Sequence, residues 1–281
     1  MISGALLLNR DYDLMFFLKK RFSRILIPFI FWVIVLGLFH YYVLGLNLDK
    51  TLDWMLGSGV TWHVYELIGA YFFIPVVNAF IQKYGEGGIK YFLIIWGVTI
   101  ILSVFNINPF PHLKLDYFAG FIGYMVLGYY LFSHKFNFTD SAMMLIGILL
   151  FVVFYAINCA NSFINDTFFP YMSIVLALQS AGIFLFFRYA EEYSDKNKTS
   201  ILGKIGNYIE NGWIRKVVFS ISLCSYGMYF THTFFYRALE SLDIHSIKLI
   251  PILFVIVVFL SWLVAYISSK VPLLNKVSGV K

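Results

Sequence analysis

The sequence has few charged residues. They make up 13% of its 281 residues, whereas 60% are hydrophobic and 20% are aromatic. A soluble domain carries roughly twice that charged fraction. The composition therefore excludes an ordinary globular protein with a single membrane anchor. It predicts an all-α fold, a polytopic bundle of membrane helices.

Cysteine is also scarce. The two cysteines, Cys159 and Cys224, fall in different apolar runs. We expect both to pack as small hydrophobic side chains. No spacing of His, Cys, Asp and Glu typical of a metal site occurs in the sequence, so no metal is expected.

Two other sequence features are missing. Residues 1–8 have neither the basic region nor the cleavage site of a signal peptide, so none is expected. There is no internal repeat, which weighs against a transporter built from inverted repeats.

Long apolar runs make up most of the sequence. A membrane helix needs about 20 mostly apolar residues. Eight such spans are predicted, at about 25–46, 61–82, 90–107, 117–133, 141–163, 170–190, 217–237 and 247–269. The apolar stub at 2–8 would be the tail of a ninth. We expect one membrane domain over residues 1–281, with a charged loop at 191–216 in which 200–209 can form a short interfacial helix.

The cations are distributed unevenly between the predicted loops. If the basic box Lys19-Lys20-Arg21…Arg24 is cytoplasmic, 17 of the 21 cations fall on the inner side. The outer side keeps Lys50, Lys114, Arg237 and Lys248. This positive-inside bias predicts a multi-pass protein of the inner or plasma membrane with a cytoplasmic C-terminus. Because the cations are spread along one membrane face, no nucleic-acid partner is expected.

Polar side chains form a stripe on the predicted 217–237 helix. Ser222, Ser225, Tyr229, His232 and Tyr236 recur at spacings of three and four, which puts them on one helical face. The stripe predicts either a polar cavity or a hydrogen-bonded helix interface. Within it, His232 is the side chain best suited to move protons near neutral pH.

A second polar group lies at the outer end of the predicted 61–82 helix. His63 and Glu66 are one turn apart, and Glu66 is the acid expected within a span. A carboxylate that orients an imidazole is a general-base arrangement. The alternative is a hydrated, structural pair in the headgroup region.

The basic box has two interpretations. It can be the positive-inside stop of the first full span. Arg21 and Arg24, three residues apart, also project from one side of a helix, and guanidinium groups bind phosphates in a bidentate way. Lys20, Arg21 and Arg24 are therefore candidates to bind a phosphate-bearing ligand.

Five motifs in order carry a family resemblance over essentially the whole chain. They are ISGALLL, FFLKKRFSRILIPFIFW, WHVYELIGAYFFIPVV, YFAGFIGYMVLGYYLF and CSYGMYFTHTFF. Together they resemble the acyltransferase-3 family, integral membrane O-acyltransferases that modify surface polysaccharides. The resemblance implies transfer of an acyl group, usually acetyl from acetyl-CoA, to a sugar hydroxyl.

The resemblance also implies roles for individual residues. Arg21 and Arg24 match the basic motif that serves the CoA phosphates, and Ser3 and Gly4 match a Ser-Gly after the family's second helix. The late-helix motif matches Ser225, Tyr226, Gly227, Tyr229 and His232.

Two departures from the family pattern stand out. No histidine has a Lys or Arg eleven positions before it, so the family's first helix and most of its second are expected to be absent, with its key histidine outside this chain. Near Trp62, the family's histidine position falls on Val60, so His63 is not carried over from that motif.

The resemblance thus implies a membrane O-acyltransferase that moves an acyl group, expected to be acetyl, from acyl-CoA to a hydroxyl of a cell-surface or lipid-linked glycan. Its partners would be acyl-CoA, the glycan acceptor and membrane lipid, without a bound cofactor. His232, Glu66 and His63 are the candidate catalytic residues; Ser225, Tyr229, Tyr236 and Ser3 are expected to line the cavity. The alternatives are a transporter or flippase of a lipid-linked saccharide and an inactive fragment of the acyltransferase.

Overall fold

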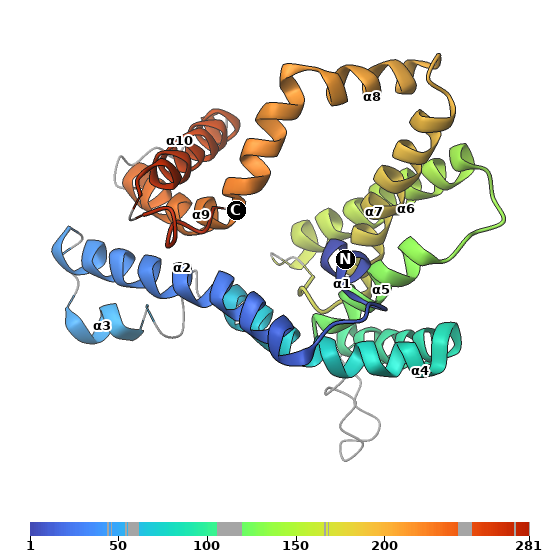
Figure 1. The fold of residues 1–281 in the computed structure, drawn as a ribbon, viewed down its shortest axis with the longest axis horizontal. Coiled ribbons are helices and arrows are strands. Elements are labelled where there is room, and N and C mark those ends of the chain that lie inside the picture. The colour runs from blue at the N-terminus through green and yellow to red at the C-terminus, as the bar shows by residue number, and fades with distance from the viewer. Residues whose placement is uncertain are drawn as a thin grey trace. The chain divides into compact units, whose positions relative to one another are not determined.

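The computed structural model describes residues 1–43, 45, 47–53, 55, 62–105, 120–165, 167, 169–240, 249–272 and 274–280. Over these residues the chain is helical and contains no β-strand (Figure 1). The helices are α1 (Ile2–Leu7), α2 (Leu14–Tyr42), α3 (Leu48–Asp53), α4 (Trp62–Val104), α5 (Ile122–Ser133), α6 (Asp140–Asn165), α7 (Ile174–Lys196), α8 (Ile201–Asn211), α9 (Trp213–Glu240) and α10 (Ile250–Lys270). The predicted all-α fold is confirmed.

Among the described residues, five helices are long and apolar enough to cross a membrane: α2, α4, α6, α7 and α10. Helix α4 has 43 residues and covers two predicted spans. It is interrupted at Gly85, whose φ of 57° is accessible to glycine. Helix α9 is long enough, but its polar side chains lower its hydropathy, and α5 has only 12 residues. The count of eight spans therefore stays a prediction.

Some predicted features lie outside the described residues. These are Val60, Lys114 and Lys248, most of the outer loops at 108–116 and 238–246, and the first residues of the spans predicted at 117–133 and 247–269.

Helix α2 begins well before the predicted position 25. The Asp13 carboxylate accepts a hydrogen bond from the backbone N–H of Phe16 at 2.7 Å, which caps the helix there. Lys and Arg are good helix formers, so the basic box interrupts the apolar run without ending the helix. Arg21 and Arg24 consequently lie on a continuous helix, two to three turns after its start.

The contacts divide the chain into two units. Unit 1 comprises Met1–Asp11 and Phe72–Asn211, and unit 2 comprises Tyr12–Tyr71 and Gly212–Lys281. Helix α4 contributes its first part to unit 2 and the rest to unit 1, with Pro75 close to the division. The prediction of a single domain stays a prediction.

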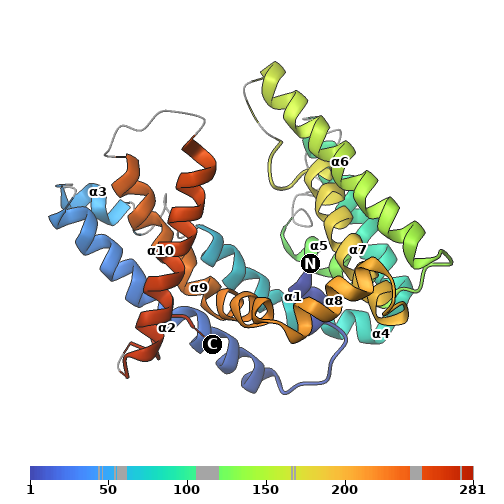
Figure 2. The same ribbon diagram turned by 90° about the horizontal axis from the view of Figure 1, so that it is seen from above.

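In unit 1, helices pack through glycines. Helices α6 and α7 run side by side in both views (Figures 1 and 2). A Cβ added at Gly147 of α6 would lie 2.8 Å from the carbonyl oxygen of Gly182 of α7, so this contact requires glycine. Helix α1 packs on α5 in the same way, because a Cβ at Gly4 would clash with the Met125 carbonyl group. Small residues commonly allow such close approach of membrane helices.

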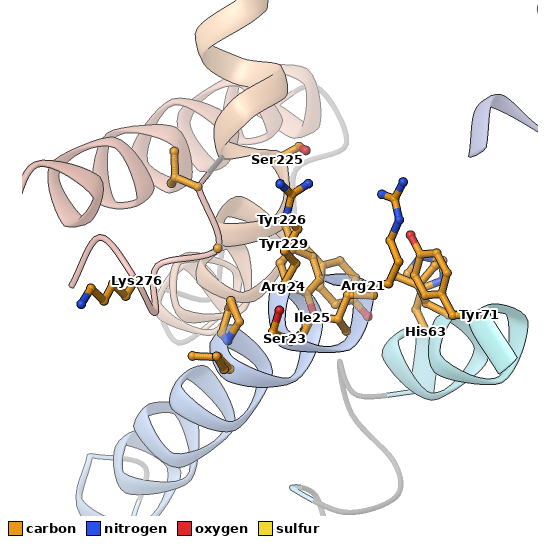
Figure 3. Close-up of a pocket in the computed structure, with 15 residues that line it drawn as sticks. Arg21, Ser23, Arg24, Ile25, His63, Tyr71, Ser225, Tyr226, Tyr229 and Lys276 are labelled. Atoms are coloured by element: carbon orange, nitrogen blue, oxygen red, sulfur yellow. Dashed lines mark hydrogen bonds between the residues drawn. The ribbon is translucent and has the colours of Figure 1, made fainter. Parts of the chain in front are cut away.

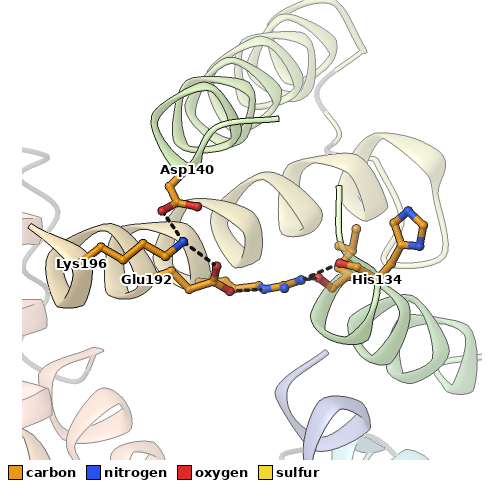
Figure 4. Close-up of polar contacts among 6 residues, drawn as sticks. His134, Asp140, Glu192 and Lys196 are labelled. Carbon is orange, nitrogen blue, oxygen red and sulfur yellow. Dashed lines mark hydrogen bonds and ion pairs between the residues drawn. The ribbon is translucent and has the colours of Figure 1, made fainter. Parts of the chain in front are cut away.

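A charged network ties three helices of unit 1 together. Arg188 of α7 donates to the carbonyl oxygens of Leu131 and His134 at the end of α5, and its Nε lies 3.1 Å from Glu192. Lys196 Nζ lies 2.7 Å from the Asp140 carboxylate in the first turn of α6 (Figure 4). An arginine that binds the last carbonyl groups of a helix stabilises that helix end.

Two ion pairs of unit 1 each join loop regions that the cation count puts on the same membrane face. Glu86, at the break in α4, lies 3.1 Å from the imidazole of His134. Lys196 and Asp140 join the end of α7 to the start of α6. Both contacts are consistent with the predicted alternation of loops.

In unit 2, hydrogen bonds join α9 to its neighbours. The Tyr226 hydroxyl donates to the carbonyl oxygen of Ile25 on α2 at 3.1 Å. The Thr231 hydroxyl donates to Ser261 O on α10 at 3.3 Å, and the Trp262 indole donates to Ser220 Oγ at 3.0 Å. These residues lie outside the predicted polar stripe. Within the stripe, the Ser225 hydroxyl donates to Ser222 O of its own helix at 2.8 Å.

We expect the change Gly4→Ala to destabilise unit 1. The added methyl group meets the Met125 carbonyl, and overpacking of this kind costs about 1–3 kcal/mol. Thermal unfolding in detergent should show a lower Tm. Gly97→Ala is the matched control, because no atom lies within 4 Å of its added Cβ. An equal Tm for the two variants would contradict the close α1–α5 contact.

Candidate functional site

The described part of unit 2 contains an open cavity of about 600 Å³. Its walls come from the first half of α2, the start of α4, the middle of α9 and the segment that follows α10 (Figure 3). Its polar or aromatic lining residues are Arg21, Ser23, Arg24, His63, Tyr71, Ser225, Tyr226, Tyr229 and Lys276. The volume lies within the range of small-molecule sites.

The two arginines of the basic box both line this cavity. In Figure 3 their guanidinium groups extend to the same side of α2. The Arg21 guanidinium lies 5.7 Å from the centre of the Phe17 ring, a cation–π contact that restrains it. Lys20 does not line the cavity; its ammonium group lies 5.3 Å from the Phe16 ring on the exposed side of the helix.

An imidazole lines the same cavity as the arginines. His63 lies beside Tyr229, with ring centres 5.7 Å apart. Two residues later on α4, Tyr65 contacts Phe29 near the middle of α2, at 5.7 Å between ring centres. His63 therefore lies level with the middle of α2 and not with its far end, where the span assignment would put it. The physical reason is that the first part of α4 packs against the half of α2 that carries the basic box. There the ring centres of Tyr71 and Phe17 are 6.3 Å apart.

The predicted stripe of α9 is divided between two cavities. Ser225 and Tyr229 line the arginine cavity. His232 and Tyr236 line another of about 620 Å³, formed with α10. Tyr229 lies next to both imidazoles, since its ring centre is 5.9 Å from that of His232. The stripe thus faces cavities along its length, while Ser222 is exposed.

Glu66 and Ser3 line neither the arginine cavity nor the cavity formed with α10. Glu66 is exposed and is not among the lining residues, and among the described ion pairs none joins it to His63. Although the two are one turn apart, only the imidazole turns toward α9. Ser3 belongs to α1 in unit 1, where it lines a separate cavity with Tyr124.

Sequence reasoning missed Tyr71 and the segment after α10. Tyr71 lies off the face defined by His63 and Glu66, and no pattern marks it. The segment 274–280 has no helical periodicity, so the sequence carries no signal for its position.

The segment after α10 is packed tightly against α2 and α9. Ser278 is fully buried, and its carbonyl oxygen accepts a hydrogen bond from the Trp32 indole at 3.1 Å. A Cβ added at Gly227 would lie 2.6 Å from the same oxygen. Gly279 has a φ of +80° and lies against Tyr226. This segment, 274–280, is named the C-terminal strap below.

The sequence matches one known family. A family model described as "Acyltransferase domain", that of acyltransferase 3, matches residues 1–268. The chain belongs to the acyltransferase-3 family. No curated protein and no solved structure matches it.

As an acyltransferase-3 protein, the chain is a multi-pass membrane protein of an acyltransferase family. The matched region includes every lining residue of the arginine cavity except those of the C-terminal strap, which follows residue 268. Among the described residues, no group of three His, Cys, Asp or Glu side chains is placed to hold a metal ion.

We expect Gly227→Ala to displace the C-terminal strap. The methyl group overlaps the Ser278 carbonyl, and we expect a destabilisation of about 1–3 kcal/mol. Trp32→Phe removes only the indole hydrogen bond and should cost about 1 kcal/mol. Limited proteolysis should cut the strap faster in both variants. Gly69→Ala, which meets no atom within 4 Å, serves as control, and equal cleavage rates in all three would refute the packing.

Proposed function

We propose that this protein transfers an acyl group, most simply acetyl, from acyl-CoA to a hydroxyl of a cell-surface or lipid-linked glycan. The observation that carries the proposal is that Arg21, Arg24 and His63 line one cavity. Phosphate-binding groups and a proton-accepting group are the two requirements for using a CoA thioester, and family membership supports their combination.

The arginines are proposed to bind the acyl donor. CoA carries a diphosphate and a ribose phosphate, and guanidinium groups bind such oxygens through paired N–H donors that an ammonium group lacks. Arg21 and Arg24 would hold these phosphates at the open end of the cavity. Lys20, exposed beside them, would add to the positive potential that attracts the donor.

The imidazoles serve the transfer. His63 is the proposed general base, because it shares the cavity with the arginines. It would take the proton of the acceptor hydroxyl as the oxygen attacks the thioester carbonyl. The C–O bond forms, the C–S bond breaks, and the proton passes to the departing CoA thiolate. His232 and Tyr236, in the adjoining cavity, are proposed to contact the acceptor, with Tyr229 between the two imidazoles.

The other candidates have secondary roles in this scheme. Ser225 would contribute its hydroxyl to the wall of the donor cavity. Glu66 is exposed, and its role as partner of the base stays a prediction; the same holds for Ser3 as a cavity residue.

Donor binding gives the most direct test. We expect Arg21→Ala and Arg24→Ala each to weaken CoA binding to the purified protein in detergent by about tenfold or more, because each removes a charge-assisted contact. Arg→Lys should recover only part of the affinity. Lys19→Ala removes a cation from the same box outside the cavity and should change binding little. Unchanged CoA affinity in both arginine variants would contradict the proposal that Arg21 and Arg24 bind CoA.

Transfer gives the second test. We expect His63→Ala to lower incorporation of labelled acetyl into surface glycan by about 10²–10⁴-fold while leaving CoA affinity nearly unchanged, because loss of a general base acts on the chemical step. His232→Ala should raise the acceptor concentration that gives half-maximal transfer, because His232 is proposed to contact the acceptor. Full transfer by His63→Ala would rule out His63 as the base.

The same measurements separate the competing functions. A transporter or flippase of a lipid-linked saccharide has no acyl donor. If the chain has this function, the wild-type protein would move the saccharide across the membrane of vesicles without binding CoA. An inactive fragment would bind CoA through Arg21 and Arg24 and transfer nothing.

A further inference from the structure

A second cationic cavity lies in unit 2, between the start of α9 and the end of α10. Its volume is about 630 Å³. Three lysines line it, each from a different segment: Lys216 from the first turn of α9, Lys270 from the last turn of α10 and Lys276 from the C-terminal strap. Three lysines from separate segments therefore line one cavity.

Among the described residues, no carboxylate balances the charge of this cavity. Its lining contains no Asp or Glu, and among the described residues no ion pair joins a carboxylate to any of the three lysines. Lys270 lies over the Tyr266 ring at 5.1 Å, which orients its ammonium group. Like charges that line one cavity repel one another, so an anion in the cavity would be bound favourably.

Fixed polar groups complete the lining. The Ser220 hydroxyl is held by the Trp262 indole at 3.0 Å, and Ser269 lies one residue before Lys270. Hydroxyl and ammonium groups together match the oxygen atoms of a phosphate.

The surroundings of the cavity are apolar and exposed. Phe219, which lines it, is 61% exposed, and Val218 and Ile267 on the same helix ends are 55% and 53% exposed. In a membrane protein such side chains face lipid tails. A ligand with a phosphate and two hydrocarbon chains fits this combination better than a free phosphate, which has no use for the apolar rim.

This cavity is separate from the one that holds Arg21 and Arg24. The C-terminal strap lies between them, since Lys276 and Val280 belong to both linings. In Figure 3 the ammonium end of Lys276 points away from both arginines.

We propose that the cavity lined by Lys216, Lys270 and Lys276 binds the phosphate headgroup of an anionic phospholipid, whose acyl chains lie along the exposed sides of α9 and α10. The proposal does not rest on the proposed acyl transfer. The bound lipid would hold the strap against the two helix ends, because one of its three cationic contacts is Lys276.

The test compares lipids on the purified full chain. Native mass spectrometry and thermal unfolding in detergent are recorded with added phosphatidylglycerol, phosphatidylcholine or inorganic phosphate. We expect phosphatidylglycerol to bind and to raise the Tm, phosphatidylcholine to have much less effect, and inorganic phosphate at the same concentration none. Equal stabilisation by inorganic phosphate would overturn the lipid assignment in favour of a soluble anion.

Matched variants locate the site. Lys216→Gln, Lys270→Gln and Lys276→Gln should each weaken phosphatidylglycerol binding by about fivefold, in keeping with the contribution of one lysine near an anionic lipid. Lys→Arg changes at the same positions keep the charge and should keep binding, which separates loss of the site from misfolding. The control Lys83→Gln, Lys135→Gln, Lys204→Gln removes the same charge from exposed lysines of unit 1. If this triple variant lowers binding as much as a variant that combines Lys216→Gln, Lys270→Gln and Lys276→Gln, the effect comes from general charge and the proposed site is wrong.

Discussion

The close approach of the C-terminal strap to Gly227 is the contact on which both cationic cavities depend. The Ser278 carbonyl lies against the backbone of α9, where a side chain larger than hydrogen would push it away, and the Trp32 indole holds it from α2. The strap is one wall of the arginine cavity and one wall of the lysine cavity. Two sites for phosphate-bearing molecules thus share a single non-helical segment.

Polar side chains of α9 form hydrogen bonds to neighbouring helices and line cavities. Tyr226, Thr231 and Ser220 form bonds to α2 and α10 and so fix the helix. Tyr226 and Ser220 also line cavities, as do Ser225, Tyr229, His232 and Tyr236. Interhelical hydrogen bonds in membranes give modest stabilisation each, so several are needed before a polar face can be left open to a ligand.

The apolar runs made most of the helices predictable from the sequence, because long hydrophobic stretches have few alternatives in a membrane. Periodicity also found Arg21 with Arg24 and the stripe on α9. It could not show that His63 lies beside Tyr229, since that depends on how α4 packs against α2. Nor could it place Lys276, which lies in a segment without periodicity. Pairwise packing, not local pattern, determines these positions.

The proline inside helix α4 affects where this helix can bend. Pro75 has no N–H, so the carbonyl of Tyr71, four residues earlier, lacks its usual helical donor. The division between the two units falls directly after Tyr71. The missing hydrogen bond makes α4 easier to bend next to Tyr71, and a bend there would tilt a side chain that lines the arginine cavity.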